Sequence, residues 1–135
     1  MKIKEVEVST IRLPLRDPKR FANRTVSYRD YSIAHIISDD GFVGWGYCWG
    51  TPIVSIVIKD YLKHCLIGED PFNRERLWTK MLHEMSVWDR RGITSRALSV
   101  IDIALWDLIG KKSNTPINKL MGGYREEVPV YYSGG

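Results

Sequence analysis

The sequence predicts an α+β domain in which a three-stranded antiparallel meander is followed by a helical bundle. Two observations support this fold class. Residues 3–49 hold three extended runs, and an Asp-Gly turn separates the second run from the third. Residues 51–120 hold apolar side chains at helical spacing, and several helix starts share a proline at the same place.

Three strands are expected, at residues 3–13, 30–38 and 42–49. In the first, the apolar side chains change phase near Ser9–Thr10, which suggests a bulge or a strand covered on both sides. In the third, aromatic side chains alternate with glycines, so the two kinds of residue lie on opposite faces. Asp39-Asp40-Gly41 joins the last two strands, and Asp-Gly between extended runs is a strong hairpin signal.

Three helix starts share one arrangement, in which a capping oxygen precedes a proline at the first helical position. They are Thr51-Pro52, Asp70-Pro71 and Thr115-Pro116. The first of these helices is expected to end before Gly68. Another helix is expected to begin near Thr94, and spacing predicts a single apolar face. That face consists of Ala97, Val100, Ile101, Ala104, Leu105 and Leu108.

The flap, residues 14–28, has a different character, with two prolines and no clear period. Loops of this length are uncommon in compact domains and are usually functional or disordered. Phe21 lies amid basic residues, between Arg20 and Arg24, which favours an ordered flap. Such a flap could close over a carboxylate ligand and exclude water. The alternative interpretation is an ordinary solvated cluster of charges.

Composition and charge exclude some classes of function. The chain has 44% hydrophobic and 27% charged residues and no apolar stretch near the ~20 residues that a membrane helix needs. It begins without an apolar signal core, so a cytoplasmic location is expected, and Cys48 and Cys65 are expected to be free thiols. Residues 16–30 carry most of the net charge of +4. Nucleic-acid binders more often spread basic residues along a face, so no nucleic-acid partner is expected.

Candidate catalytic and metal-binding residues are few. Asp102 and Asp107 would point roughly 140° apart on a helix, so they cannot converge on one substrate. Asp102 is expected to accept hydrogen bonds from neighbouring backbone, and Asp107 to pair with Arg96 or Lys111. The histidines show no ligand spacing, and no cluster of acids is spaced to converge on a hard cation. No catalytic residue and no metal ligand is therefore predicted in this chain.

Residues 96–123 carry a motif with many matches at fixed spacing. The run resembles the signature that ends the N-terminal capping domain in the mandelate racemase/muconate-lactonizing branch of the enolase superfamily. Val100 departs from the pattern, because a smaller residue is usual there. The matching positions are Ala97, Ser99, Asp102, Ala104, Leu105, Asp107, Gly110, Lys111, Pro116 and Leu120 to Gly122.

The resemblance implies a division of the chain and of its chemistry. Residues 1–123 would be the capping domain, and residues 124–135 the truncated start of a C-terminal (β/α) barrel, with its first strand at residues 128–135. In this family the acids, bases and metal ligands lie on the barrel. The resemblance therefore implies no cofactor in this chain, which alone would be inactive, and Mg²⁺ in the barrel of the intact parent. That parent would abstract the α-proton of a small carboxylate, an acid sugar or a 2-hydroxy acid, as a racemase or dehydratase, and would be a homo-oligomer.

The resemblance also implies where substrate would meet this domain. In similar enzymes the segment between the first two strands and the segment after the third reach over the barrel mouth. The candidate substrate-binding residues are Arg20, Phe21, Arg24, Tyr47 and Trp49. Tyr47 follows Gly44-Trp45-Gly46 where many relatives have glutamate, which looks more like mandelate racemase than like the cycloisomerases. The alternative function is a stand-alone binding or interaction module that reuses the capping fold.

Overall fold

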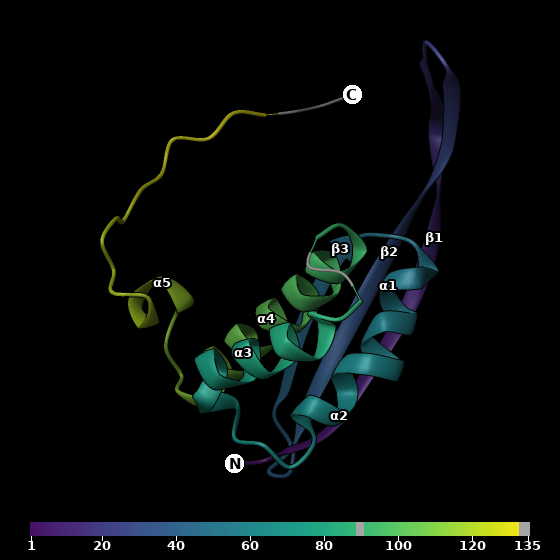
Figure 1. Cartoon of the computed structure of the whole chain (residues 1–135). Helices are drawn as coiled ribbons and strands as arrows, with labels where there is room; N and C mark the ends of the chain where they lie inside the picture. The colour runs from purple at the N-terminus through teal and green to yellow at the C-terminus, as the bar shows by residue number, and fades with distance from the viewer. Residues whose placement is uncertain (89–90, 133–135) are drawn as a thin grey trace.

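The computed structural model describes residues 1–88 and 91–132 as one antiparallel sheet with helices packed on one face (Figure 1). The strands follow the order β1-β2-β3, with β1 at Ile3–Phe21, β2 at Arg24–Ser38 and β3 at Val43–Trp49. The predicted meander, and with it the α+β class, is confirmed.

The predicted hairpin turn lies between β2 and β3. Gly41 has φ +89°, a left-handed conformation that glycine adopts without a steric penalty. Ser38 closes the turn, because its backbone N–H donates to the Phe42 carbonyl (2.9 Å) and its hydroxyl accepts from the Phe42 N–H (2.9 Å). Local chemistry is therefore sufficient to place this turn.

The first two strands extend far beyond their predicted ends. The flap is the outer part of the β1–β2 hairpin, which projects past the helices as a two-stranded ribbon (Figure 1). The predicted bulge at Ser9–Thr10 is wrong, because pairing is continuous there and the register shifts instead between Ile3 and Glu5 and between Pro14 and Lys19. Pro14 and Pro18 lack the N–H that a strand ladder needs, which explains the second of these shifts.

The helices follow the sheet along the chain. The predicted first helix is confirmed as a continuous run that ends before Gly68. It consists of α1 (Pro52–Val57), the π-helical η1 (Ile58–Leu62) and α2 (Lys63–Leu66). After it come the 3-10 turn η2 (Pro71–Asn73), α3 (Arg74–Met85), α4 (Ile93–Lys112) and α5 (Ile117–Leu120). In the described residues, no helix is both long and apolar enough to cross a bilayer.

Only one of the three expected caps makes its side-chain bond. Asp70 accepts a hydrogen bond from the Phe72 N–H (3.0 Å). Thr51 is an N-cap without a side-chain bond. The expected cap at Thr115 is wrong, because its hydroxyl donates to the Ser113 carbonyl and Pro116 itself is the N-cap. The proline signal thus locates the helices, while the detailed capping depends on each local turn.

Helix α4 packs against β3 at very short range. All six residues of its predicted apolar face are buried. Gly44 and Gly46 form the strand face beneath them, and a Cβ built on Gly46 would lie 2.0 Å from the Val100 carbonyl oxygen. The glycine face of β3 is therefore the core face, since only a residue without a side chain lets the helix backbone approach this closely.

The opposite face of the sheet carries large side chains. Trp45, Tyr47 and Trp49 project from β3 on that side and are exposed. The Trp45 ring packs on the His35 ring of β2, with centroids 3.7 Å apart. Helices cover only the glycine side of β3, so this aromatic face stays open in the described chain.

Residues 124–132 follow α5 without helix or strand and are mostly exposed. The expected barrel strand at residues 128–135 forms no ladder in the described residues, and residues 133–135 lie outside them. The domain boundary after residue 123 therefore stays a prediction.

Candidate functional site

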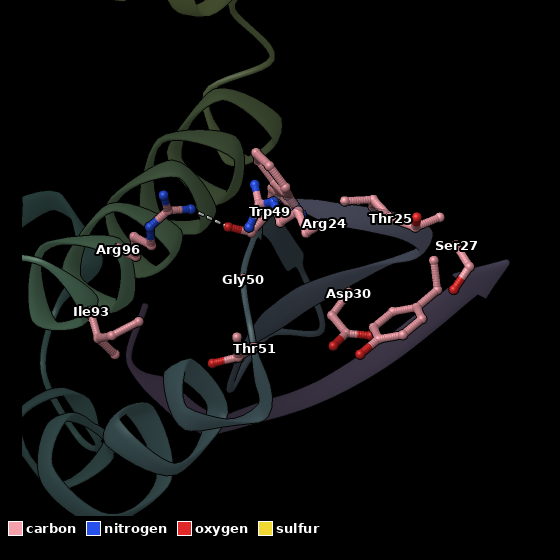
Figure 2. Close-up of a pocket in the computed structure, with 11 residues that line it drawn as sticks. Arg24, Thr25, Ser27, Asp30, Trp49, Gly50, Thr51, Ile93 and Arg96 are labelled. Carbon is pink, nitrogen blue, oxygen red and sulfur yellow. Dashed lines mark hydrogen bonds between the residues drawn. The ribbon is translucent and has the colours of Figure 1, made fainter. Parts of the chain in front are cut away.

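A pocket of about 500 Å³ lies alongside the projecting hairpin, and its lining on β2 runs from Arg24, next to the hairpin tip, to Asp30 (Figure 2). Three segments that are distant in the sequence form its walls: β2, the turn after β3, and the first turns of α4. Their lining residues are Arg24, Thr25, Val26, Ser27, Tyr28, Asp30, Trp49, Gly50, Thr51, Ile93 and Arg96.

The turn after β3 is tied to β2 through backbone contacts. The Gly50 N–H donates to the Asp30 carbonyl at 3.0 Å. A Cβ at Gly50 would lie 3.0 Å from a Val54 methyl group and 3.1 Å from the Cys48 sulfur, so a larger residue would crowd these two side chains. These contacts hold Trp49 and Thr51 at the rim of the pocket.

The one acidic side chain on the pocket wall is neutralised by a neighbour. Arg12 of β1 donates to both carboxylate oxygens of Asp30, from Nε to Oδ1 at 2.7 Å and from Nη2 to Oδ2 at 2.9 Å. The hydrogen bonds from Arg12 hold the pKa of Asp30 below its ordinary value. The same guanidinium lies 3.8 Å from the Tyr28 ring centroid. Asp30 is therefore a weak base with a compensated charge.

Two arginines of the pocket wall have no carboxylate partner among the described residues. The Arg24 guanidinium lies 5.6 Å from the Phe21 ring centroid at the tip of the hairpin. Arg96 donates to the backbone carbonyl of Trp49, across the pocket from the hairpin (Figure 2). With Asp30 compensated by Arg12, the pocket presents net positive charge, and guanidinium groups recognise carboxylates well.

The structure separates the predicted site residues into two groups. Arg24 and Trp49 line the pocket. Arg20 and Phe21 lie on β1, directly opposite Thr25 and Arg24, and neither lines the pocket; the Phe21 side chain is 55% exposed. Tyr47 is 64% exposed on the open face of the sheet and also lies outside the pocket. A substrate-facing role stays a prediction for all five residues.

Sequence reasoning missed Arg96 and the Arg12–Asp30 ion pair at this site. Arg96 was considered only as a partner for Asp107, whereas it bonds to the turn after β3. The Arg12–Asp30 pair lies directly across neighbouring strands, and opposite charges at such positions are a usable signal once the register is known. The register itself was the missing information.

The two acids of the α4 motif have different partners. Asp102 pairs with the Arg74 side chain at 2.5 Å, so the expected backbone partners are wrong for this residue. Asp107 pairs with Lys111 at 2.5 Å, one of the two partners considered, and also accepts from the Trp45 backbone N–H at 2.8 Å. Each carboxylate ties α4 to a different neighbour, so they do not act together.

The described carboxylates do not fit a magnesium site. Mg²⁺ needs several oxygen ligands that converge in octahedral geometry. In residues 1–88 and 91–132 the one group of three or more potential ligands is His64, Cys65 and Glu84, which offers a single carboxylate. No magnesium chemistry is therefore assigned to residues of this chain.

Comparison with known proteins finds a matching family and several sequence relatives. The family model "Mandelate racemase / muconate lactonizing enzyme, N-terminal domain" matches residues 3–122. D-galactarolactone cycloisomerase of Agrobacterium fabrum is 36% identical over 99% of this chain and 36% of its own length. Arabinonate dehydratase of Saccharolobus solfataricus is 41% identical over 74% of this chain and 28% of its own length.

A solved structure has the same fold. The crystal structure of a racemase from Streptomyces coelicolor A3(2) with bound magnesium matches with a TM-score of 0.89 at 33% identity, covering 96% of this chain and 38% of that one. The present chain thus spans about a third of the length of these relatives. The motif of α4, the meander and the match over residues 3–122 lead to one assignment. The chain belongs to the mandelate racemase/muconate lactonizing enzyme family and has the fold of its N-terminal capping domain.

Proposed function

We propose that this chain is the substrate-capping domain of a mandelate racemase-like enzyme. A barrel beginning near residue 124 would supply the acid–base residues and the magnesium. The whole enzyme would remove the α-proton of a small carboxylate, an acid sugar or a 2-hydroxy acid, as a racemase or dehydratase. It would act in the cytoplasm as a homo-oligomer. The names of the relatives support this reaction class, since they include a racemase and a dehydratase of a sugar acid.

One observation carries the proposal: the pocket beside the hairpin combines a compensated acid with two arginines that have no carboxylate partner among the described residues. Arg24 and Arg96 offer planar donors to a carboxylate, while the Arg12 pair removes the repulsion that a free Asp30 would exert. Trp49 and the hairpin would shield the ligand from water, which strengthens such charged hydrogen bonds. The residues of this chain bind, orient and enclose, and the proton transfer would take place on the barrel.

The test uses the longer enzyme in which this domain precedes its barrel. Arg24→Gln removes one pocket cation and should raise KM for the anionic substrate about tenfold or more, as expected for loss of a charged hydrogen bond of about 1.5–3 kcal/mol. Arg16→Gln is the matched control, because it removes the same exposed charge from the same hairpin at a position outside the pocket lining. Its kinetic effect should be within about twofold, since exposed charges are screened.

Two further variants test whether the hairpin and Trp49 enclose the bound substrate. Trp49→Ala and Phe21→Ala should lower kcat/KM by up to about a hundredfold if these side chains position substrate or exclude water. Both side chains are more than half exposed, so the melting temperature should change little. Unchanged kinetics in Arg24→Gln and Trp49→Ala would show that the pocket is only a solvated surface, and the proposal would be abandoned.

A further inference from the structure

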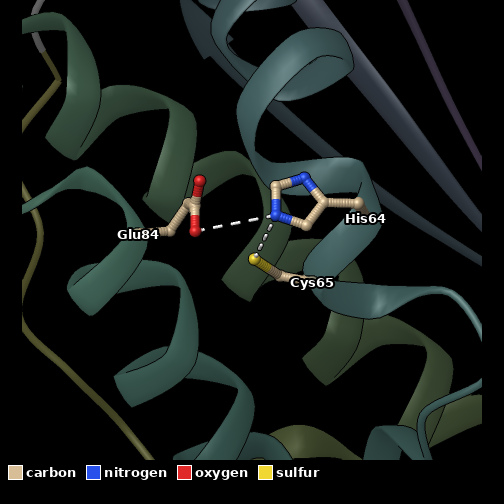
Figure 3. Close-up of side chains that lie close together, drawn as sticks. All are labelled: His64, Cys65 and Glu84. Atoms are coloured by element: carbon tan, nitrogen blue, oxygen red, sulfur yellow. Dashed lines mark hydrogen bonds and ion pairs between the residues drawn. The ribbon is translucent and has the colours of Figure 1, made fainter.

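Away from the proposed site, three potential metal ligands meet where two helical segments pack together. His64 and Cys65 are neighbours in α2, directly after the π-helical η1, and Glu84 lies near the end of α3 (Figure 3). One ligand atom from each lies within 4.8 Å of the others. The two segments are separated by η2 in the chain, so the cluster arises only through tertiary packing.

Two of the three ligand–ligand distances are close to the edges of a tetrahedral zinc site, and the third, between Cys65 and Glu84, is within 4.8 Å. His64 Nε2 lies 3.6 Å from Cys65 Sγ and 3.6 Å from Glu84 Oε2. Zinc bonds of about 2.3 Å to sulfur and 2.0–2.2 Å to nitrogen and oxygen, at tetrahedral angles, place neighbouring ligand atoms about 3.3–3.5 Å apart. The imidazole nitrogen therefore needs to move by only a few tenths of an ångström relative to each partner.

The donor set is one that zinc prefers. It combines a thiol, an imidazole and a carboxylate, the three ligand types found in protein zinc sites. Mg²⁺ and Ca²⁺ require oxygen ligands, of which the cluster offers only those of Glu84. We propose that His64, Cys65 and Glu84 form a binding site for a zinc-like divalent cation that joins α2 to α3.

Exposure and neighbouring charges are compatible with this site. The Cys65 residue is 1% exposed, whereas the side chains of His64 and Glu84 are 58% and 38% exposed. A cation can therefore approach from solvent between the two outer ligands and bind above the sulfur. Lys80, one helical turn before Glu84 on α3, is paired with Glu69 at 2.9 Å. On binding, the thiol proton leaves to solvent and a zinc–thiolate bond forms.

Three protein ligands leave one tetrahedral position for water or another small ligand. A bound ion would therefore cross-link α3 to the helical run from α1 to α2. A ligand that binds only the folded state stabilises it by mass action. Zinc should therefore raise the unfolding midpoint of the chain, and a chelator should reverse the shift.

The experiment titrates the tag-free chain with Zn²⁺ against a chromophoric chelator, and with Co²⁺ as a spectroscopic probe. We expect one ion per chain, and for Co²⁺ a tetrahedral ligand-field spectrum with a thiolate charge-transfer band. Mg²⁺ in large excess should leave Zn²⁺ bound. Absence of stoichiometric Zn²⁺ binding, or an octahedral Co²⁺ spectrum without the thiolate band, would overturn the proposal.

Matched variants assign the ligands. His64→Gln and Glu84→Gln change exposed side chains, and each should weaken Zn²⁺ at least about tenfold, since even outer-sphere changes cost 10–100-fold. His83→Gln, at the neighbouring position on α3, is the control for histidine and should bind as the unaltered chain does. If His64→Gln and Glu84→Gln keep full affinity, the three side chains are only a surface ion pair above a buried thiol.

The sulfur is tested separately because Cys65 belongs to the core. Cys65→Ser should abolish the thiolate band, whereas Cys48→Ser, which alters the other free cysteine, should retain it. Circular dichroism of both variants shows whether they fold. If Cys65→Ser fails to fold, the His64→Gln and Glu84→Gln variants and the Cys48→Ser spectrum still test the proposal. Loss of the thiolate band in Cys48→Ser would show that the sulfur ligand is Cys48 and would contradict the proposal.

Discussion

Replacement of Gly46 by alanine should test the close packing of helix α4 against β3, which forms much of the core. The added Cβ would lie 2.0 Å from the Val100 carbonyl oxygen and 2.9 Å from the Ala104 backbone nitrogen. Both atoms belong to the helix backbone, so no side-chain rotation can relieve the overlap. Helix α4 must then withdraw from β3 and loosen the contacts of its buried face.

The size of the effect follows from two opposing terms. Overpacking of this kind costs about 1–3 kcal/mol, and contact with backbone favours the upper end. Alanine also restricts the unfolded chain, which offsets about 0.4–1 kcal/mol. Gly46→Ala should therefore lower the free energy of unfolding by about 2 kcal/mol, or the melting temperature by roughly 5–10 °C for a domain of this size.

The measurement is urea unfolding followed by circular dichroism, with Gly41→Ala as the control. Gly41 has open space around its Cβ position but φ +89°, so its substitution reports backbone strain without a clash. That strain costs about 1–2 kcal/mol, and the same unfolded-state offset brings the expected loss below about 1.5 kcal/mol. If Gly46→Ala costs less than Gly41→Ala, α4 does not lie on β3 as described, and the packing argument fails.

Three other outcomes are expected. Asp30 and Asp40 have pKa values held below the ordinary 3.8, so their contribution to stability is present above that value and lost as pH falls through the folded values. Urea midpoints at pH 7 and pH 3 should show this decline, and Arg12→Gln should reduce it. Arg74→Gln leaves Asp102 half-buried without its guanidinium partner and should destabilise the chain by about 1–3 kcal/mol, whereas the double variant with Asp102→Asn should recover part of the loss, as measured by a double-mutant cycle. The open aromatic face of β3 should promote self-association in sedimentation experiments, and Trp45→Lys should weaken it; a chain that stays monomeric at all concentrations would contradict this.

Local patterns in the sequence were sufficient for the elements and for much of the core. Asp39-Asp40-Gly41 defines its turn because few other residues adopt the φ that the turn requires. The apolar face of α4 follows from the helical period, and strand alternation separates the glycines of β3 from its aromatic residues, although only the packing of α4 shows that the glycine face is the buried one. The α4 motif also led to the family, which the match over residues 3–122 confirms.

The extended hairpin could not be read from the same patterns. Pro14 and Pro18 interrupt the period of two, and the charged residues beyond them face solvent on a ribbon that helices do not cover. Without a buried face there is no alternation to detect. Strand pairing across the ribbon, rather than burial, keeps the flap ordered.

Tertiary structure alone decided which side chains meet. Arg12 reaches Asp30 because of strand register, Arg96 reaches the carbonyl of Trp49 because α4 crosses the end of β3, and neither distance is encoded in local spacing. The His64–Cys65–Glu84 cluster was missed for the same reason, since its ligands come from separate helices. Sequence periodicity reports which face of an element is buried, whereas a binding site depends on how those faces are brought together, and that depends on packing over the whole domain.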